Sequence, residues 1–219
     1  VLPYGWRYQL KMRPDGTGYY VEIPLTEADL LDPQEGDRKM QKSKHARCAV
    51  EIFDRLDNYY IDDPTTNIFF DLKMEWGIPG LKEPAPDIAV VPQMREKDPD
   101  LGTFKVQEHG TRPTLVIEVM SPHYQGDDTV KVTLYQMAGV TEYLVINPYH
   151  GDCRDHYHLT LYRLVGQQYQ AVKPDLAGRC FSETTGIFFH TSVNRREILL
   201  TVATTGEKLL TAKEEKQAR

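Results

Sequence analysis

The sequence predicts an α/β fold in which a mixed β-sheet is flanked by helices. The main observation is a strand–helix–strand unit: apolar runs at Thr114–Met120 and Glu142–Asn147 enclose a helical pattern at Asp127–Ala138. A crossover through one helix favours parallel pairing of the two strands, around Glu118 and Tyr143. Alternating apolar segments on either side of this unit predict hairpins. Parallel and antiparallel pairing are therefore both expected.

The first sixty residues predict a hairpin, a short helix and a long helix. WRYQL and YYVEI alternate on either side of Pro14-Asp15-Gly16, and Asp-Gly supplies the positive φ of a tight turn. LTEADLL predicts a short helix capped by Thr26, with Asp29 where the acid of a capping box stands. From Lys44 to Ile61, apolar residues at three- and four-residue spacing predict an amphipathic helix. They are Ala49, Ile52, Phe53, Leu56 and Tyr60.

Short strands and loops fill the rest of the chain. Thr66–Trp76 is rich in β-forming residues, and a four-residue apolar run after Asp87 predicts a short buried strand. Residues 92–111 are charged and are expected to form a loop. After the central unit we expect a hairpin around Gly166, a strand at Gly186–His190, a final hairpin from ILLTVAT and EKLLT, and a charged helical tail.

The composition is that of a globular protein without a membrane segment. No apolar run reaches the roughly 18 residues that a membrane-spanning helix needs. Three cysteines without tight spacing argue against a disulfide framework and indicate a reducing, cytoplasmic environment. The net charge of −6 argues against a surface that coats nucleic acid broadly, although it permits a local basic groove.

Two carboxylates stand where apolar residues are expected. Asp87 opens one buried strand and Glu118 interrupts another, and burying an unpaired charge is costly. Carboxylates at strand ends suit Mg²⁺, which keeps several waters and leaves room for phosphate oxygens. On the following helix, Asp127, Lys131 and Tyr135 form one ladder at four-residue spacing. The pattern fits metal-assisted phosphodiester hydrolysis, and it fits a structural Glu118–Lys131 ion pair equally well.

Four motifs resemble a known nuclease family. PDIAVV, LVIEVMSP, D-x-x-x-K-x-x-x-Y and AGVTEYLVINP are similar to the Uma-type restriction endonucleases, a bacterial branch of the PD-(D/E)XK nuclease superfamily. The resemblance covers roughly Leu25 to Pro148. It implies a restriction-endonuclease-like fold: one nuclease-like domain over 1–219, with its core at 25–148, a β-rich extension at 149–211 and a charged tail at 212–219. Hairpins would be added at both ends.

The same resemblance implies a function and its partners. We expect a cytoplasmic endonuclease that uses Mg²⁺ or Mn²⁺ to hydrolyse phosphodiester bonds in nucleic acid, DNA foremost, and that can form a homo-oligomer. The basic groove would draw on Lys42, Lys44 and Arg47. A nuclease-fold protein that no longer cuts and serves in binding or assembly is the alternative.

The resemblance also assigns site residues. Asp87 and Glu118 match the metal ligands, with the backbone carbonyl of Val119 as a third. The superfamily lysine position holds Met120, and Lys131 on the helix matches the family's lysine, which would position water or stabilise the transition state. Supporting groups would be Tyr135, Asp127, Ser121, His45 and Glu35, with Asp71 as a weaker candidate.

Two histidine patterns have simpler interpretations. His45 in the first turn of its helix is most simply a solvent-facing or capping residue. A cluster at 150–158 contains zinc-ligand types but matches no closed zinc framework, so a solvated loop is expected there. Its residues are His150, Cys153, His156 and His158.

Overall fold

A six-stranded mixed sheet forms the centre of the molecule. The computed structural model describes residues 2–121, 126–148, 156–194 and 196–218. The strand order is β11-β10-β9-β8-β6-β4. Only β8 and β9 run parallel among these neighbours, and the predicted mixed sheet with its parallel central pair is confirmed. The strands are β4 (Asn67–Phe70), β6 (Ile88–Val91), β8 (Leu115–Val119), β9 (Glu142–Asn147), β10 (His158–Val165) and β11 (Gln168–Ala171).

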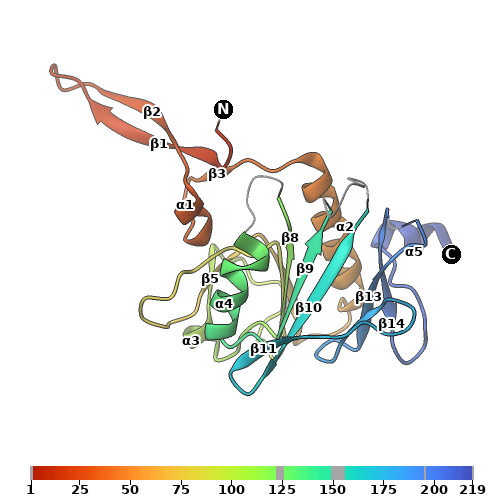
Figure 1. Cartoon of the computed structure of the whole chain (residues 1–219). Coiled ribbons are helices and arrows are strands. Elements are labelled where there is room, and N and C mark those ends of the chain that lie inside the picture. The colour runs from red at the N-terminus through yellow and green to blue at the C-terminus, as the bar shows by residue number, and fades with distance from the viewer. Residues whose placement is uncertain (1, 122–125, 149–155, 195, 219) are drawn as a thin grey trace.

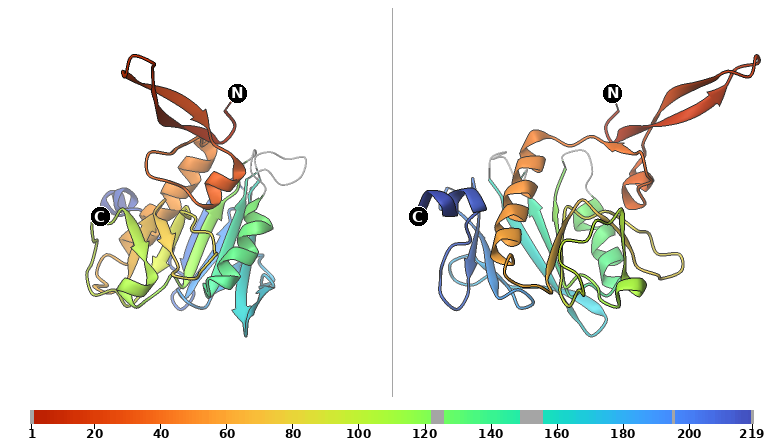
Figure 2. Two further views of the ribbon diagram at one scale, coloured as in Figure 1. Left: turned by 90° about the vertical axis from the view of Figure 1, so that its left-hand side faces the viewer. Right: turned by 180° about the vertical axis from the view of Figure 1, so that it is seen from behind.

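The two long helices cover opposite faces of this sheet. Figure 1 shows α4 (Val130–Met137) in front and α2 (Ser43–Tyr59) behind, and Figure 2 shows the same from the back. Along β8, Ile117 packs in the α2 cluster, whereas Val116 and Met120 pack in the α4 cluster. Because alternate side chains of a strand point to opposite faces, Glu118 points towards α4.

The C-terminal strands extend the core on the α2 side. Three antiparallel strands pack against α2, with Phe189 and Leu200 in the same buried cluster as Ile52. The final hairpin is only partly as predicted, because EKLLT forms a single bridge, Thr201 to Lys208, instead of a strand. These elements are β12 (Cys180–Ser182), β13 (Ile187–Thr191), β14 (Ile198–Val202) and the tail helix α5 (Ala212–Ala218).

The segment expected as a loop at 92–111 contains regular structure. It forms β7 (Thr103–Lys105), which pairs in parallel with β5 (Lys73–Glu75), and α3 (Val106–His109). Phe104 is the reason: its fully buried ring packs 5.5 Å from that of Phe69. The β-rich segment expected at 66–76 is split into β4 and β5, because Asp71 adopts a left-handed conformation with φ of 47°.

The central helix begins later than predicted. Residues Gly126–Asp128 form a 3₁₀ turn, and α4 starts at Val130. The carbonyl oxygen of Asp127 accepts a hydrogen bond from the Tyr143 hydroxyl at 2.7 Å, where a helix would use it for the amide four residues later. This contact ties the 3₁₀ turn before α4 to β9.

No helix in the described parts of the chain is long and apolar enough to cross a membrane.

The predicted N-terminal hairpin projects from the body as an arm. It consists of β1 (Gly5–Met12) and β2 (Gly18–Pro24), paired over seven positions, and Figures 1 and 2 show it extending into solvent. A two-residue strand, β3 (Arg38–Lys39), returns along its base. The helix predicted after the hairpin is α1 (Glu27–Leu31), and the Asp29 carboxylate accepts the Thr26 amide at 2.7 Å, as a capping acid does.

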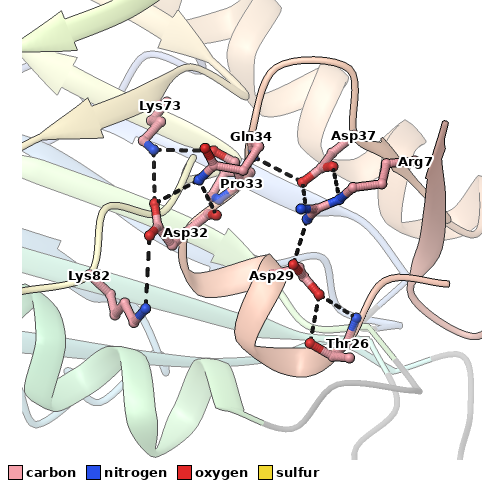
Figure 3. A network of polar contacts seen from close by, with 9 residues as sticks. All are labelled: Arg7, Thr26, Asp29, Asp32, Pro33, Gln34, Asp37, Lys73 and Lys82. Carbon is pink, nitrogen blue, oxygen red and sulfur yellow. Dashed lines mark hydrogen bonds and ion pairs between the residues drawn. The ribbon is translucent and has the colours of Figure 1, made fainter. Parts of the chain in front are cut away.

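Ion pairs hold the base of the arm (Figure 3). Arg7 contacts Asp29 at 2.5 Å and Asp37 at 2.8 Å, which joins β1 to α1 and to the following turn. Gly5 allows the close approach of β3, because a Cβ there would lie 1.9 Å from the carbonyl oxygen of Arg38. A second link from Asp32 to Lys73, at 2.8 Å, ties the end of α1 to β5 in the body.

Removing Arg7 is expected to loosen the arm without unfolding the body. Arg7→Ala leaves the buried Asp37 carboxylate without its cation, and an isolated two-stranded hairpin is only marginally stable. Hydrogen exchange of the β1 and β2 amides should become at least about tenfold faster, which corresponds to about 1.4 kcal/mol, while β8 and β9 keep their protection. Arg13→Ala near the hairpin turn is the matched control, and equal exchange in the two variants would contradict this role of Arg7.

Candidate active site

A small cavity opens where the end of β8, the start of α2 and the turn before α4 meet. Its volume is about 70 Å³, enough for more than one water, since each needs roughly 10–15 Å³. The base of the arm closes one side through Pro3, Tyr4 and Lys39. Seven residues expected for the site also line the cavity: His45, Asp87, Glu118, Val119, Ser121, Asp127 and Lys131.

Lys131 is held between two carboxylates. Its Nζ atom lies 2.8 Å from Glu118 Oε1 and 2.9 Å from Asp127 Oδ1. The Tyr135 hydroxyl donates to the same Glu118 oxygen at 2.7 Å. All four side chains are buried, so these contacts are shielded from solvent. The 3₁₀ turn and the first turns of α4 thus bring the predicted Asp127–Lys131–Tyr135 ladder against β8.

Asp87 is positioned by two other groups. His45 Nε2 lies 3.1 Å from Asp87 Oδ1, and the Val119 amide donates to Asp87 Oδ2 at 2.8 Å. His45 is only 6% exposed, so the interpretation of this residue as solvent-facing is wrong. The first turn of α2 places His45 beside the buried carboxylate of Asp87, which becomes its hydrogen-bond partner. Its Nδ1 atom has no hydrogen-bond partner among the described residues.

Burial and mutual repulsion set the charges of this cluster. Burial raises the pKa of Glu118 to about 7, with Asp87 and Asp127 adding to the rise and Lys131 opposing it. Burial also raises the pKa of Asp127. Burial opposes ionisation of Asp87 as well, but the bond from His45 and the charge of Lys131 bring its pKa below the ordinary value.

The two basic groups favour their protonated forms. Burial alone would lower the pKa of Lys131, but the carboxylates of Asp127, Glu118 and Asp87 raise it above its ordinary value. Lys131 is therefore a cation and not a proton acceptor. Burial also works against a charged His45, yet the hydrogen bond and charge of Asp87 raise its pKa.

The donor set suits a hard divalent cation. Three buried carboxylates lie around one lysine, and the negative charges of Asp87 and Asp127 add to the rise that burial produces in the pKa of Glu118. No three histidine, cysteine, aspartate or glutamate side chains converge as a ready ligand cage in the described ranges. Mg²⁺ does not require such a cage, because one or two carboxylates with several waters suffice. Asp87 and Glu118, at the same cavity, fit that requirement.

Other expected residues lie elsewhere. Glu35 is exposed and lines a different hollow beside α1, together with Asp71, which is paired with Lys39. The structure therefore does not bring Glu35 or Asp71 to the cavity. Lys42 is exposed beside the start of α2, and Lys44 and Arg47 line a separate cleft. Within the zinc-type cluster, His150 and Cys153 lie outside the described residues.

Several residues of the cavity and its support were not identified from the sequence. The Tyr143 hydroxyl donates to the Asp127 carbonyl, and its ring centroid lies 4.9 Å from that of Tyr135; the Trp76 ring lies 6.0 Å from that of Tyr135. The position of Tyr143 in an otherwise aliphatic strand was a usable signal. Tyr4 and Gln41 come from the base of the arm, and no local pattern relates that segment to β8.

Comparison with known proteins identifies relatives. A model of the family described as "Uma2: Putative restriction endonuclease" matches residues 37–187. A similar solved structure is described as "a putative nuclease belonging to DUF820" from Anabaena variabilis ATCC 29413. It shares 19% sequence identity, with a TM-score of 0.47 over 65% of this chain and 76% of the other. No curated protein matches the chain.

Proposed function

Since the chain belongs to the Uma2 family, described as "Putative restriction endonuclease", we propose that it is a metal-dependent endonuclease that hydrolyses phosphodiester bonds. Asp87 and Glu118 would hold a divalent cation, Mg²⁺ or Mn²⁺, with the Val119 carbonyl as a further ligand. Such an ion, when bound, polarises the phosphate and lowers the pKa of a bound water. The proposal depends most on the position of Lys131. Its amine is paired with Glu118, and both residues line the same cavity as Asp87.

Lys131 acts as a fixed positive charge. Its raised pKa keeps the amine protonated, so it donates hydrogen bonds and does not accept the proton of the attacking water. In this role it orients a water or stabilises the negative charge that develops on the phosphate. A helix-borne lysine can serve here because α4 packs on the face of β8 to which Glu118 points.

The remaining side chains hold the ligands in place. Tyr135 restrains Glu118 through its 2.7 Å hydrogen bond, and His45 with the Val119 amide restrains both oxygens of Asp87. Asp127 shares the Lys131 amine and so limits how far it moves. Ligands held by packing and hydrogen bonds lose little freedom when a metal binds.

Plasmid cleavage with Mg²⁺ or Mn²⁺ tests the proposal. The wild-type protein should cut, and Asp87→Asn should show no detectable cleavage, because the amide removes a charged ligand while preserving size. Glu142→Gln is the matched control. Glu142 is also a buried carboxylate, but it does not line the cavity and lies 2.8 Å from Arg163. Its replacement should leave cleavage intact.

Two results would contradict the proposal, each in a different way. Equal cleavage by the wild type and Asp87→Asn would overturn the metal assignment. Absence of metal-dependent cleavage in the folded wild type, with nucleic-acid binding retained, would favour the alternative of a nuclease-fold protein that binds or assembles without cutting.

A further inference from the structure

A second, larger hollow runs along α2 on the side away from the sheet centre. This α2 cleft has a volume of about 720 Å³ and lies between α2, β14 and the segment that leads into α5. Five basic side chains line it against three acidic ones, although the whole chain has a net charge of −6. The basic residues are Lys44, Arg47, Arg55, Arg196 and Lys208, and the acidic ones are Glu51, Glu197 and Glu214.

Arg55 has unused hydrogen-bonding capacity in this cleft. Its side chain is only 9% exposed, and its Nε atom has no hydrogen-bond partner among the described residues. Within the described ranges one ion pair partly neutralises it, from Nη2 to Glu214 Oε1 at 3.2 Å. That glutamate also accepts the Thr211 amide at 2.8 Å and caps α5. A buried guanidinium with an unmade hydrogen bond is costly, so its position at the cleft indicates an anionic ligand.

The basic groups are arranged along a line. Lys44, Arg47 and Arg55 lie on one side of α2, and the helix rises about 18 Å between Ser43 and Arg55 at 1.5 Å per residue. A nucleic-acid strand in a duplex carries one negative charge per about 3.4 Å of axis. The line of basic groups is several times longer than this spacing, which favours an extended polyanion over a single small anion.

The cleft adjoins the candidate active site through the first turns of α2. His45 faces the site cavity, whereas Lys44 and Arg47 face the cleft. The residue preceding the helix, Lys42, provides no side-chain hydrogen bond to the first helical amides. The amide groups at the start of a helix attract phosphate. A strand lying in the cleft would therefore pass over an electropositive helix end on its way to Asp87.

We propose that the α2 cleft binds the sugar–phosphate backbone of a nucleic acid, with Arg47, Arg55 and Arg196 contacting successive phosphates. This inference rests on the proposed function for its substrate class, and it assigns the binding surface to α2 together with the C-terminal strands. It predicts binding that does not depend on metal and that weakens steeply with salt.

The test measures binding of a fluorescent 20-base-pair DNA duplex by anisotropy in EDTA, over a range of salt concentrations. Arg47→Ala/Arg196→Ala removes two exposed cations of the cleft, so folding should be retained, as circular dichroism will check. Affinity should fall at least about tenfold, and the slope of log K against log salt should become about 2 units shallower. Arg95→Ala, an exposed arginine outside the cleft, is the matched control and should bind like the wild type.

Binding and cleavage separate the two proposals. Unchanged affinity in Arg47→Ala/Arg196→Ala, or no duplex binding by the wild type, would overturn the cleft assignment. Salt-dependent binding that the double variant weakens, without any metal-dependent cleavage by the wild type, would support the cleft and overturn the proposed function alone.

Discussion

Lys131→Met is expected to lower the rate of metal-dependent cleavage at least about 100-fold and to destabilise the fold by about 3 kcal/mol. The rate falls because a fixed cation no longer faces the phosphate, and groups of this kind typically contribute that much. Stability falls because Glu118 and Asp127, 2.8 Å and 2.9 Å from the amine, are left buried without their cation. Single-turnover cleavage and urea unfolding measure the two effects.

A double variant separates catalysis from charge balance. Lys131→Met/Glu118→Leu removes both members of the buried pair, and apolar replacement of such a pair often restores or raises stability. We expect the free energy of unfolding to recover only in part, because Asp127 stays buried without its cation, while cleavage stays at least about 100-fold below the wild-type rate. If the pair served only to neutralise its own charges, the double variant would cleave DNA like the wild type, and that result would exclude a catalytic role for both residues.

The stability of the metal-free protein should fall as the pH rises from about 5 to about 8. Glu118 has a pKa of about 7 in the folded state against 4.5 ordinarily, so the native state holds a proton that the unfolded state releases. Its contribution is fully present below pH 4.5 and is lost as the pH rises through 7. The loss amounts to about 3 kcal/mol, at 1.36 kcal/mol for each pH unit between the two values.

Neighbouring groups do not cancel this trend. The raised pKa of His45 acts in the same direction, because its stabilising charge is lost as the pH rises through its folded pKa. The lowered pKa of Asp87 adds stability above its ordinary value of 3.8, and that gain is complete before the window begins. Urea unfolding in EDTA at pH 5, 6, 7 and 8 measures the trend. Glu118→Gln should flatten it, and an unchanged pH dependence in this variant would refute the assignment.

Periodicity predicted much of the fold because it reports which residues must be buried. The apolar run around Glu118 and the helical spacing from Ala49 to Tyr60 located β8 and α2, and both are found. The same reasoning failed for β7, where one buried ring, Phe104, anchors an otherwise charged segment. A single apolar side chain leaves no period to detect.

The candidate site was predictable only in part. Asp87 and Glu118 stood out because carboxylates in apolar strands require partners. The partners themselves depended on packing: the first turn of α2 brings His45 to Asp87, and the Tyr143 hydroxyl binds the carbonyl of Asp127 in the turn before α4. Glu35, expected in the site, is exposed and lines the neighbouring hollow, which shares Lys39 with the cavity.

By itself the sequence determined most of the strands and helices, the parallel central pair and the carboxylates that need a partner when they are buried. Each of these follows from local spacing and from the cost of burial. Only the tertiary structure decided that Lys131 lies between Glu118 and Asp127, that the arm's base closes the cavity, and that Arg55 faces a basic cleft. Such contacts join residues far apart in the chain, and their geometry is set by how whole elements pack, which no local pattern encodes.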